Sequence, residues 1–324
     1  MIASVTVAAR IPAGRRLGSL ATPSIALVCT VLLMILAVRA SPATLPLIAV
    51  GFLVFTPLER IRPRRAQRFA SPDTAVNLAH ATVSTALTVG LMASAMGCIA
   101  LVPTVLVTQH WIASLCPAAA LAVVVLAGDT GYYWTHRAAH RVPVLWRFHR
   151  IHHSSEELNW LAAARAHPVD QLVLHMGWIL PLHVLGAGAP WFGVYAVFLT
   201  VEPLLAHSNI NIAIRPIGWL LVTPAFHHWH HTAEPDARNK NFASQLSFLD
   251  ALFGTWWLPR NREVERYGID EPTATTYLGQ LAAPFDPTAT GMGPSAPTHA
   301  TGGMPLAASP STQRGVTEGP VYFG

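Results

Sequence analysis

Apolar residues are concentrated in six stretches of the chain, separated by shorter polar segments. The stretches cover residues 24–38, 45–55, 75–107, 112–127, 172–185 and 191–206. A helix needs about 20 apolar residues to cross a bilayer, and a chain in lipid must satisfy its own backbone hydrogen bonds. The pattern therefore predicts an all-α protein with about four transmembrane helices. The last two stretches are short and interrupted by Pro181 and Pro190, which favours a re-entrant or short hairpin.

The composition supports a membrane-embedded chain. Apolar residues make up 52% of the 324 residues and charged residues only 11%, and the mean hydropathy is +0.39. A soluble domain carries about 25% charged residues, so this chain has too few to cover a water-facing surface. The three cysteines form no CxxC pair, which argues against a disulfide framework or a zinc–thiolate site.

Arginines flank the first two apolar stretches and predict a topology. Arg10, Arg15 and Arg16 precede the first stretch, and five arginines lie between residues 60 and 68. By the positive-inside rule both flanks are cytoplasmic, the next two stretches go out and return, and residues 132–165 face the cytoplasm. The arginines thus account for the net charge of +5 without nucleic-acid binding. Arg39 argues against cleavage of the first stretch as a signal peptide.

Composition also divides the chain into four parts. A polar and basic lead covers residues 1–20, and a transmembrane hairpin with its basic loop covers 21–70. Residues 71–262 form one membrane-embedded unit with cytoplasmic helices. The C-terminal extension, 263–324, is rich in Pro, Gly, Ala, Thr and Ser from about residue 282, which predicts disorder from there on.

Histidines carry the strongest chemical pattern. Thirteen of the 16 lie between residues 136 and 231, and most fall into three boxes, HRAAH, HRIHH and HHWHH. Residues at i, i+3 and i+4 share one face of a helix. This geometry selects eight imidazoles as candidate metal ligands: His136, His140, His149, His152, His153, His227, His230 and His231.

Eight imidazoles exceed the three or four protein ligands of one tetrahedral zinc and suit two metal ions. Imidazole accepts Fe, Zn, Cu and Ni, so the ligand type alone does not identify the metal. His207 and His167 are further candidates, whereas His228 falls about 100° from the ligand face. Asp129 is expected near the face of His136, where it would accept a proton from a ligand's second nitrogen.

The remaining histidines are weaker candidates. His80, His110 and His299 are isolated in the sequence and are interpreted as ordinary interior or surface histidines. His175 and His183 lie in an apolar stretch, where a polar residue is a functional candidate, but a hydrogen-bonded interior histidine is favoured for both.

The set of motifs resembles the fatty acid hydroxylase/sterol desaturase superfamily of integral-membrane non-haem di-iron enzymes. The matching segments cover about 130 residues and are DTGYYWTHRAAH, FHRIHHSSEELNW, RAHP, AHSN, TPAFHHWHH and NFASQLSFLDALFGTWW. The resemblance implies a four-helix membrane stem, a cytoplasmic helical cap, and two irons held by the eight selected histidines, without His228, and by His207. His167 and Asp250 match family positions whose role stays open. Ala243 and Phe248–Leu249 depart from the common pattern, but outside the boxes.

The resemblance also implies an activity. Such enzymes use O₂ and two external electrons to oxidise a C–H bond, and hydroxylation of a lipid is the first expectation, with desaturation as the alternative. The HHSSEELN segment is similar to the branch that includes alkylglycerol monooxygenase, which cleaves ether lipids. No dinucleotide fingerprint or fused cytochrome segment is present, so a separate ferredoxin, cytochrome or pterin is expected to supply the electrons.

Two other classes fit the pattern less well. A histidine-rich metal transporter would place its ligands in mid-membrane together with acidic residues. Here the boxes follow the apolar stretches and lie in segments with charged residues such as Arg137, Arg147 and Glu156. A di-zinc hydrolase would show carboxylate ligands and an HExxH-type base, and Glu156 and Glu157 lie outside the boxes.

Overall fold

The computed structural model describes residues 23–40, 44–68, 71–100, 111–212 and 215–286. Within these ranges the chain is helical and contains no β-strand, and only two isolated β-bridges occur. The prediction of an all-α protein is therefore confirmed for the described residues. The predicted lead over residues 1–20, His110, His299 and the chain beyond residue 286 lie outside them.

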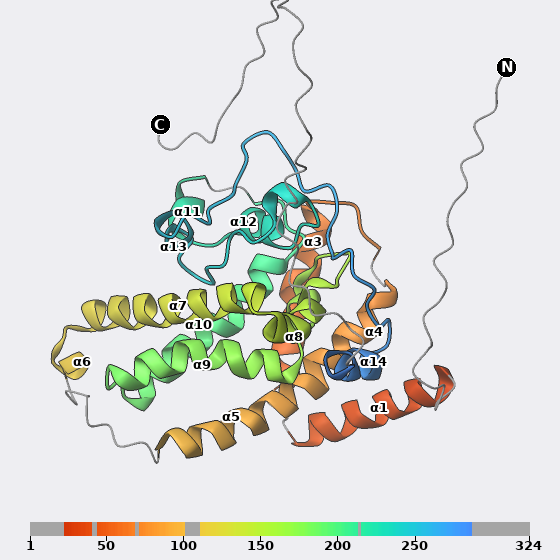
Figure 1. Ribbon diagram of the computed structural model, residues 1–324, viewed down its shortest axis with the longest axis horizontal. Helices are drawn as coiled ribbons and strands as arrows, with labels where there is room; N and C mark the ends of the chain where they lie inside the picture. Colours follow the sequence, from red (N-terminus) through yellow and green to blue (C-terminus); the bar gives the residue numbers. More distant parts are fainter. Residues whose placement is uncertain (1–22, 41–43, 69–70, 101–110, 213–214, 287–324) are drawn as a thin grey trace, which may run out of the picture. The chain divides into compact units, whose positions relative to one another are not determined.

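The helices follow one another along the chain as shown in Figure 1. In the first half they are α1 (Pro23–Ala40), α2 (Thr44–Val50), α3 (Thr56–Ile61), α4 (Pro72–Ala79), α5 (Thr85–Ala100), α6 (Trp111–Ser114) and α7 (Pro117–Arg141). The second half contains α8 (Pro143–His153), α9 (Pro168–Val184), α10 (Ala189–His207), α11 (Arg215–Leu220), α12 (Pro224–His230), α13 (Phe248–Leu252) and α14 (Tyr277–Ala282). The π-helical segments η1 (Gly51–Phe55) and η2 (His80–Ser84) join α2 to α3 and α4 to α5, and the short 3₁₀ segments are η3 (Trp160–Ala164), η4 (Pro235–Ala237) and η5 (Ala283–Phe285).

The helices that carry or support the histidine boxes begin at prolines. Pro117, Pro143, Pro168 and Pro224 stand in the first turns of α7, α8, α9 and α12. Proline lacks an N–H and has a fixed φ near −65°, so it suits the first helical position and prevents an earlier start. The sequence thus sets where each box helix begins.

Two helical segments are long and apolar enough to cross a membrane: residues 73–99, which run through α4, η2 and α5, and α10. α1 contains a shorter apolar segment, Val28–Arg39. Many side chains on these segments are exposed, among them Leu36, Val89 and Val197, which is typical of helices that face lipid. Two candidate spans among the described residues agree with a membrane protein but do not confirm the four spans expected from the sequence.

α7 joins an apolar half to a polar half within one continuous helix. Its first turns are apolar, and the same helix continues without a break to His136 and His140. α7 and α9 pack along each other (Figure 1), and a Cβ added to Gly131 would lie 2.0 Å from the Gly177 carbonyl oxygen. Only glycine permits backbones to approach so closely. This contact fixes α7 against α9 directly before the first box.

The C-terminal extension packs on the helical unit as far as it is described. Tyr277 of α14 is buried in a cluster with Ala37 of α1 and Ala79 of α4. The Gln280 side chain hydrogen-bonds to Nε2 of His80 at 2.8 Å, and Nδ1 of the same ring lies 3.0 Å from the Ala166 carbonyl oxygen. His80 is thus a fully partnered interior histidine, as expected from its isolation in the sequence.

Candidate metal centre

The structure brings the nine predicted ligands together in two buried clusters. The first contains His136, His140, His149, His153 and His230, and the second contains His152, His207, His227 and His231. Within each cluster, one ligand nitrogen per residue lies within 4.8 Å of every other. The clusters adjoin, because the rings of His153 and His231 stack at a centroid distance of 4.4 Å.

Each of the two HxxHH boxes contributes histidines to both clusters, two to one cluster and one to the other. In α8 the residues at i and i+4, His149 and His153, enter the first cluster, and His152 at i+3 enters the second. In the segment from α12 the i and i+4 residues, His227 and His231, enter the second cluster and His230 enters the first. Consecutive helical residues differ by about 100° in direction, so i+3 and i+4 point to opposite sides of the shared face. The face therefore supplies ligands to two neighbouring positions instead of one.

Most rings are held by a hydrogen bond at their second nitrogen. Nδ1 donates to a backbone carbonyl in His136 (Phe242, 2.8 Å), His230 (Lys240, 2.8 Å), His152 (Arg165, 3.0 Å) and His207 (Pro203, 2.8 Å). A carbonyl oxygen can only accept, so Nδ1 carries the proton and Nε2 presents a lone pair. This is the arrangement that orients histidine ligands around metals in proteins.

The donor atoms that face the cluster interiors fit cations. Nε2 of His136 and of His230 are buried without a hydrogen-bond partner. Nε2 of His152 and of His207 face each other at 3.2 Å, although both rings carry their proton on Nδ1. Two lone pairs at this distance repel each other unless a cation lies between them, and a buried unpartnered nitrogen is costly. The residues present therefore suit bound metal ions.

Burial lowers the pKa of most of the clustered imidazoles. Burial is the main cause that lowers the pKa of His230 to about 3 and of His152 to about 4, and the neighbouring His149 lowers the pKa of both further. Burial likewise lowers the pKa of His136, His140, His153, His227 and His231 well below the ordinary value. Neutral imidazole is the form that binds a metal, so these rings are in the binding form at neutral pH.

Asp170 orients a candidate ligand, His149, and the sequence alone did not predict this contact. Its carboxylate oxygens accept from Nδ1 of His149 at 3.0 and 3.1 Å, and both side chains are buried. The sequence does contain a sign of this role, because Asp170 is the only acidic residue between Glu157 and Glu202 and lies in the first turn of an apolar helix. Its distance of 21 residues from His149 hid the contact.

Asp129 does not take the place expected beside His136. Its carboxylate accepts the backbone N–H groups of Ser244, Gln245 and Leu246 at 2.7 to 3.1 Å. The prediction was wrong because it considered only the helix that contains Asp129, and the loop of residues 244–246 packs against that helix, α7. Asp129 nevertheless supports the centre indirectly, since the loop continues from Phe242, whose carbonyl accepts from His136.

Asp250 supports the same loop from its other end. Its carboxylate accepts the backbone N–H groups of Phe242 and Ala243 at 2.7 and 2.9 Å, and Thr255 donates to it at 2.7 Å. Burial raises the pKa of Asp250 to about 6. Asp250 thus fixes the backbone that orients His136, and neither Asp129 nor Asp250 belongs to the two histidine clusters.

His228 lies outside both clusters and has its own partners. Its Nδ1 lies 2.7 Å from the Tyr267 hydroxyl and its Nε2 lies 3.1 Å from the Ser208 carbonyl oxygen. Neither nitrogen is left to bind a metal. The neighbouring Trp229 is buried against Leu158 and Val264, which agrees with a packing role.

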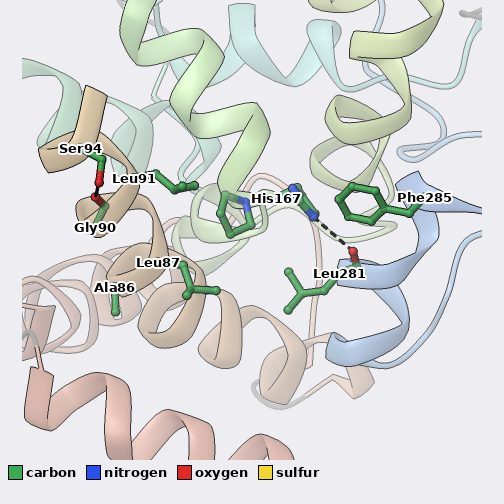
Figure 2. Close-up of a pocket in the computed structure, with 9 residues that line it drawn as sticks. Ala86, Leu87, Gly90, Leu91, Ser94, His167, Leu281 and Phe285 are labelled. Atoms are coloured by element: carbon green, nitrogen blue, oxygen red, sulfur yellow. Dashed lines mark hydrogen bonds between the residues drawn. The ribbon is translucent and has the colours of Figure 1, made fainter. Parts of the chain in front are cut away.

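His167 also lies outside the clusters. Its Nε2 is 3.2 Å from the Leu281 carbonyl oxygen, and its Nδ1 accepts the Val169 N–H at the start of α9. Figure 2 shows the ring beside Leu281 and Phe285 at the wall of a groove of about 550 Å³. His175 bonds to the Gln171 carbonyl, and neither His175 nor His183 joins a cluster.

Comparison with known proteins agrees with this site. Residues 121–255 match the fatty acid hydroxylase family model, and this segment contains all nine cluster histidines, Asp129, Asp170 and Asp250. This part of the chain is therefore similar to the fatty acid hydroxylase family, whose enzymes are iron-dependent.

Several curated proteins are similar to the same region. An ornithine lipid hydroxylase from Rhizobium tropici is 35% identical over 48% of this chain and 47% of its own length. The alkylglycerol monooxygenase of Homo sapiens is 33% identical over 46% of this chain and 33% of its own length. Methylsterol monooxygenase 1 of Rattus norvegicus is 27% identical over 39% of this chain and 43% of its own length. This chain thus spans less than half the length of these relatives, and no solved structure matches it.

Proposed function

We propose that this protein is a membrane-bound non-haem di-iron oxygenase that hydroxylates a C–H bond of a lipid, using O₂ and an external electron donor. The observation that supports this most directly is the pair of adjoining, buried, all-histidine clusters with their rings held at Nδ1. The relatives named above are lipid or sterol hydroxylases and monooxygenases, which supports the same reaction class.

The composition of the clusters favours redox chemistry over hydrolysis. Among the described residues, both clusters consist of histidine alone, whereas di-zinc hydrolases combine carboxylate ligands with an acidic general base. Asp170, the acid nearest to a ligand, is occupied by the Nδ1 of His149. No carboxylate in the described part of the chain is therefore placed to activate a water within the clusters.

The protein's contribution to the reaction follows from its geometry. When bound, two irons in these clusters would supply O₂ activation, with one oxygen atom entering the substrate and the other leaving as water. His136, His149 and His230 are oriented by Phe242, Asp170 and Lys240, so little reorganisation is needed. Burial of the ligands keeps bulk water away from the reacting atoms.

We propose that the groove shown in Figure 2 accepts the hydrocarbon chain of the substrate. Leu87, Gly90 and Leu91 of α5 form one wall, and Leu281 and Phe285 form another. α5 lies within a candidate membrane span, so an acyl chain could enter the groove from the bilayer. His167 and Pro168 form its third wall. These two residues stand at the start of α9, whose first turn contains Asp170.

The proposed topology keeps four transmembrane helices, a short hairpin and cytoplasmic histidine boxes. The arginines between residues 60 and 68 support it through the positive-inside rule. A single cysteine placed at the exposed Arg141, in a variant without Cys29, Cys98 and Cys116, tests the orientation. An impermeant thiol reagent should label this cysteine only after the inner membrane is opened. Labelling in intact spheroplasts would show that the histidine boxes face the opposite side.

Desaturation and ether cleavage are the alternatives within the same superfamily. The test is to supply purified, iron-loaded protein with a membrane lipid extract, a reductant and isotopically labelled O₂, followed by mass spectrometry. Hydroxylation predicts a lipid that gains one labelled oxygen atom. A product that loses two hydrogens, or an ether lipid that splits, would replace the proposed reaction, and trials with ferredoxin, cytochrome and pterin donors would identify the reductant.

A further inference from the structure

A second cavity, of about 380 Å³, lies where the apolar segment of α2, η1 and α3 meets the arginine-rich loop. Its wall comes from four parts of the chain: the run from Phe52 to Arg68, Thr74 of α4, the start of η3 at Trp160, and Asn209 just after α10. The cavity is separate from the histidine clusters and from the groove on α5, since they share no lining residue. Neither the family model nor the proposed reaction assigns it a ligand.

Basic groups dominate the lining of this cavity. Arg60, Arg65 and Arg68 line it, and Arg60 and Arg68 are exposed. The one acid among the lining residues is Glu59, and its Oε1 accepts the backbone N–H groups of Trp160 and Asn209 at 2.8 and 2.9 Å. Three arginines against one carboxylate give the cavity a net positive charge, which attracts an anion and can hold it by forked hydrogen bonds.

Apolar surface continues directly from the basic cavity. The Phe52 ring, which lines it, packs edge-on against Trp160 at a centroid distance of 5.1 Å. Leu53 and Ile61 on the same helical run are 77% and 74% exposed. An occupant that is anionic at one end and apolar at the other therefore matches this region better than a small soluble anion does.

The arginine-rich loop that lines the cavity is hydrogen-bonded to the segment just after a cluster histidine, His207. The Arg64 N–H donates to the Asn209 carbonyl at 2.9 Å, the Asn211 N–H donates to the Arg62 carbonyl at 2.8 Å, and Pro63 forms a bridge with Ile210. The Asn209 side chain also hydrogen-bonds to the backbone of Arg65 at both its oxygen and its nitrogen. Asn209 follows His207 by two residues, so an occupant of the cavity contacts the segment that leaves the second cluster.

We propose that this cavity binds the anionic headgroup of a membrane lipid, with Arg60 and Arg68 contacting the phosphate and the acyl chains lying along Phe52 and Leu53. The site fits the general preference of juxtamembrane arginines for anionic lipids, but here the arginines line a defined cavity with an aromatic wall. Binding does not depend on iron or on the oxidation of a substrate. A failure of this proposal therefore leaves the proposed function intact, and the reverse also holds.

The test uses the full-length protein in a neutral detergent. Thermal unfolding is followed while short-chain phosphatidic acid, phosphatidylcholine of the same chain length, or inorganic phosphate is added. We expect phosphatidic acid to bind about tenfold more tightly than phosphatidylcholine or phosphate, and the preference to weaken as salt is raised. The double variant Arg60→Gln/Arg68→Gln should lose this preference. The matched control Arg141→Gln/Arg260→Gln, which removes two exposed arginines elsewhere, should retain it.

Two results would overturn the proposal. One is an equal preference for phosphatidic acid in the cavity variant and the control, which would place lipid binding elsewhere. The other is equal stabilisation by inorganic phosphate, which would make the cavity a phosphate site. If the double variant does not fold, the single variants Arg60→Gln and Arg68→Gln replace it, and each should weaken the preference for phosphatidic acid several-fold. The salt dependence of the wild-type protein then serves as the second measurement.

Discussion

His228 and His230 are two residues apart in one short helix, yet their surroundings differ completely. Both nitrogens of His228 have partners outside the clusters, whereas Nε2 of His230 is buried without one. The difference follows from helix geometry, because residues two apart point about 160° away from each other. A search for histidines by composition alone would treat the two residues as equal.

The first prediction compares these two residues. His230→Ala removes a donor from the first cluster and should abolish most metal binding and activity. His228→Ala should spare both and cost about 1 to 3 kcal/mol of stability, because it leaves buried polar partners unsatisfied. Metal content and product formation on the two purified variants check this, and similar losses in both would show that the helix-face assignment is wrong.

The second prediction concerns Asp170. Asp170→Asn removes the negative charge that orients His149 and should weaken metal affinity about 10- to 100-fold. Competition with a chelator measures the affinity. Asp270→Asn is the matched control, because Asp270 forms exposed ion pairs with Arg238 and Arg266, and such pairs contribute about 1 kcal/mol or less. Unchanged affinity in Asp170→Asn would remove Asp170 from the centre.

At the scale of helices, the sequence predicted the box helices well and their supports poorly. The spacing of HRIHH and HHWHH correctly indicated a shared helix face, and Pro143 and Pro224 marked where those helices begin. The loop from Phe242 to Leu246 was not predictable, because its position depends on hydrogen bonds to Asp129 and Asp250 from distant parts of the chain. Every residue has a backbone carbonyl, so the sequence does not indicate which carbonyls accept hydrogen bonds from the cluster histidines.

The third prediction tests the groove along α5. A side chain at Gly90 would meet nothing within 4 Å, and Gly97 on the same helix is equally open but outside the groove. Gly90→Leu should therefore fill the groove and lower activity on a long-chain lipid about tenfold or more, without loss of iron. Gly97→Leu should leave activity near the wild-type value. Equal activity of both variants would exclude the groove as the chain-binding site.

At the scale of the whole molecule, composition predicted the helical class and the membrane character. It did not fix the number of spans, because α7 combines an apolar half with a histidine-bearing half in one helix. The resemblance of the histidine motifs predicted all nine members of the clusters. Their division into two sets depends on how α7, α8, α10 and α12 pack together, which spacing within one helix cannot reveal.

The fourth prediction concerns stability and pH in the metal-free protein. The pKa of His152 is about 4 and that of His230 about 3 in the folded state, against about 6.5 in an unfolded chain. Below pH 6.5 the unfolded chain binds more protons, so stability falls as the pH decreases from 6.5 towards 4. Below pH 6.5 each such histidine contributes up to about 1.4 kcal/mol per pH unit. Thermal unfolding between pH 7.5 and 5 checks this, and a midpoint that rises on acidification would contradict it.

The most direct test of the central claim is the metal content of the full-length protein, purified with exclusion of oxygen and loaded with ferrous iron. Two adjoining histidine clusters predict two iron atoms per chain by elemental analysis. Stoichiometric zinc without iron, or a limit of one iron per chain, would contradict the account.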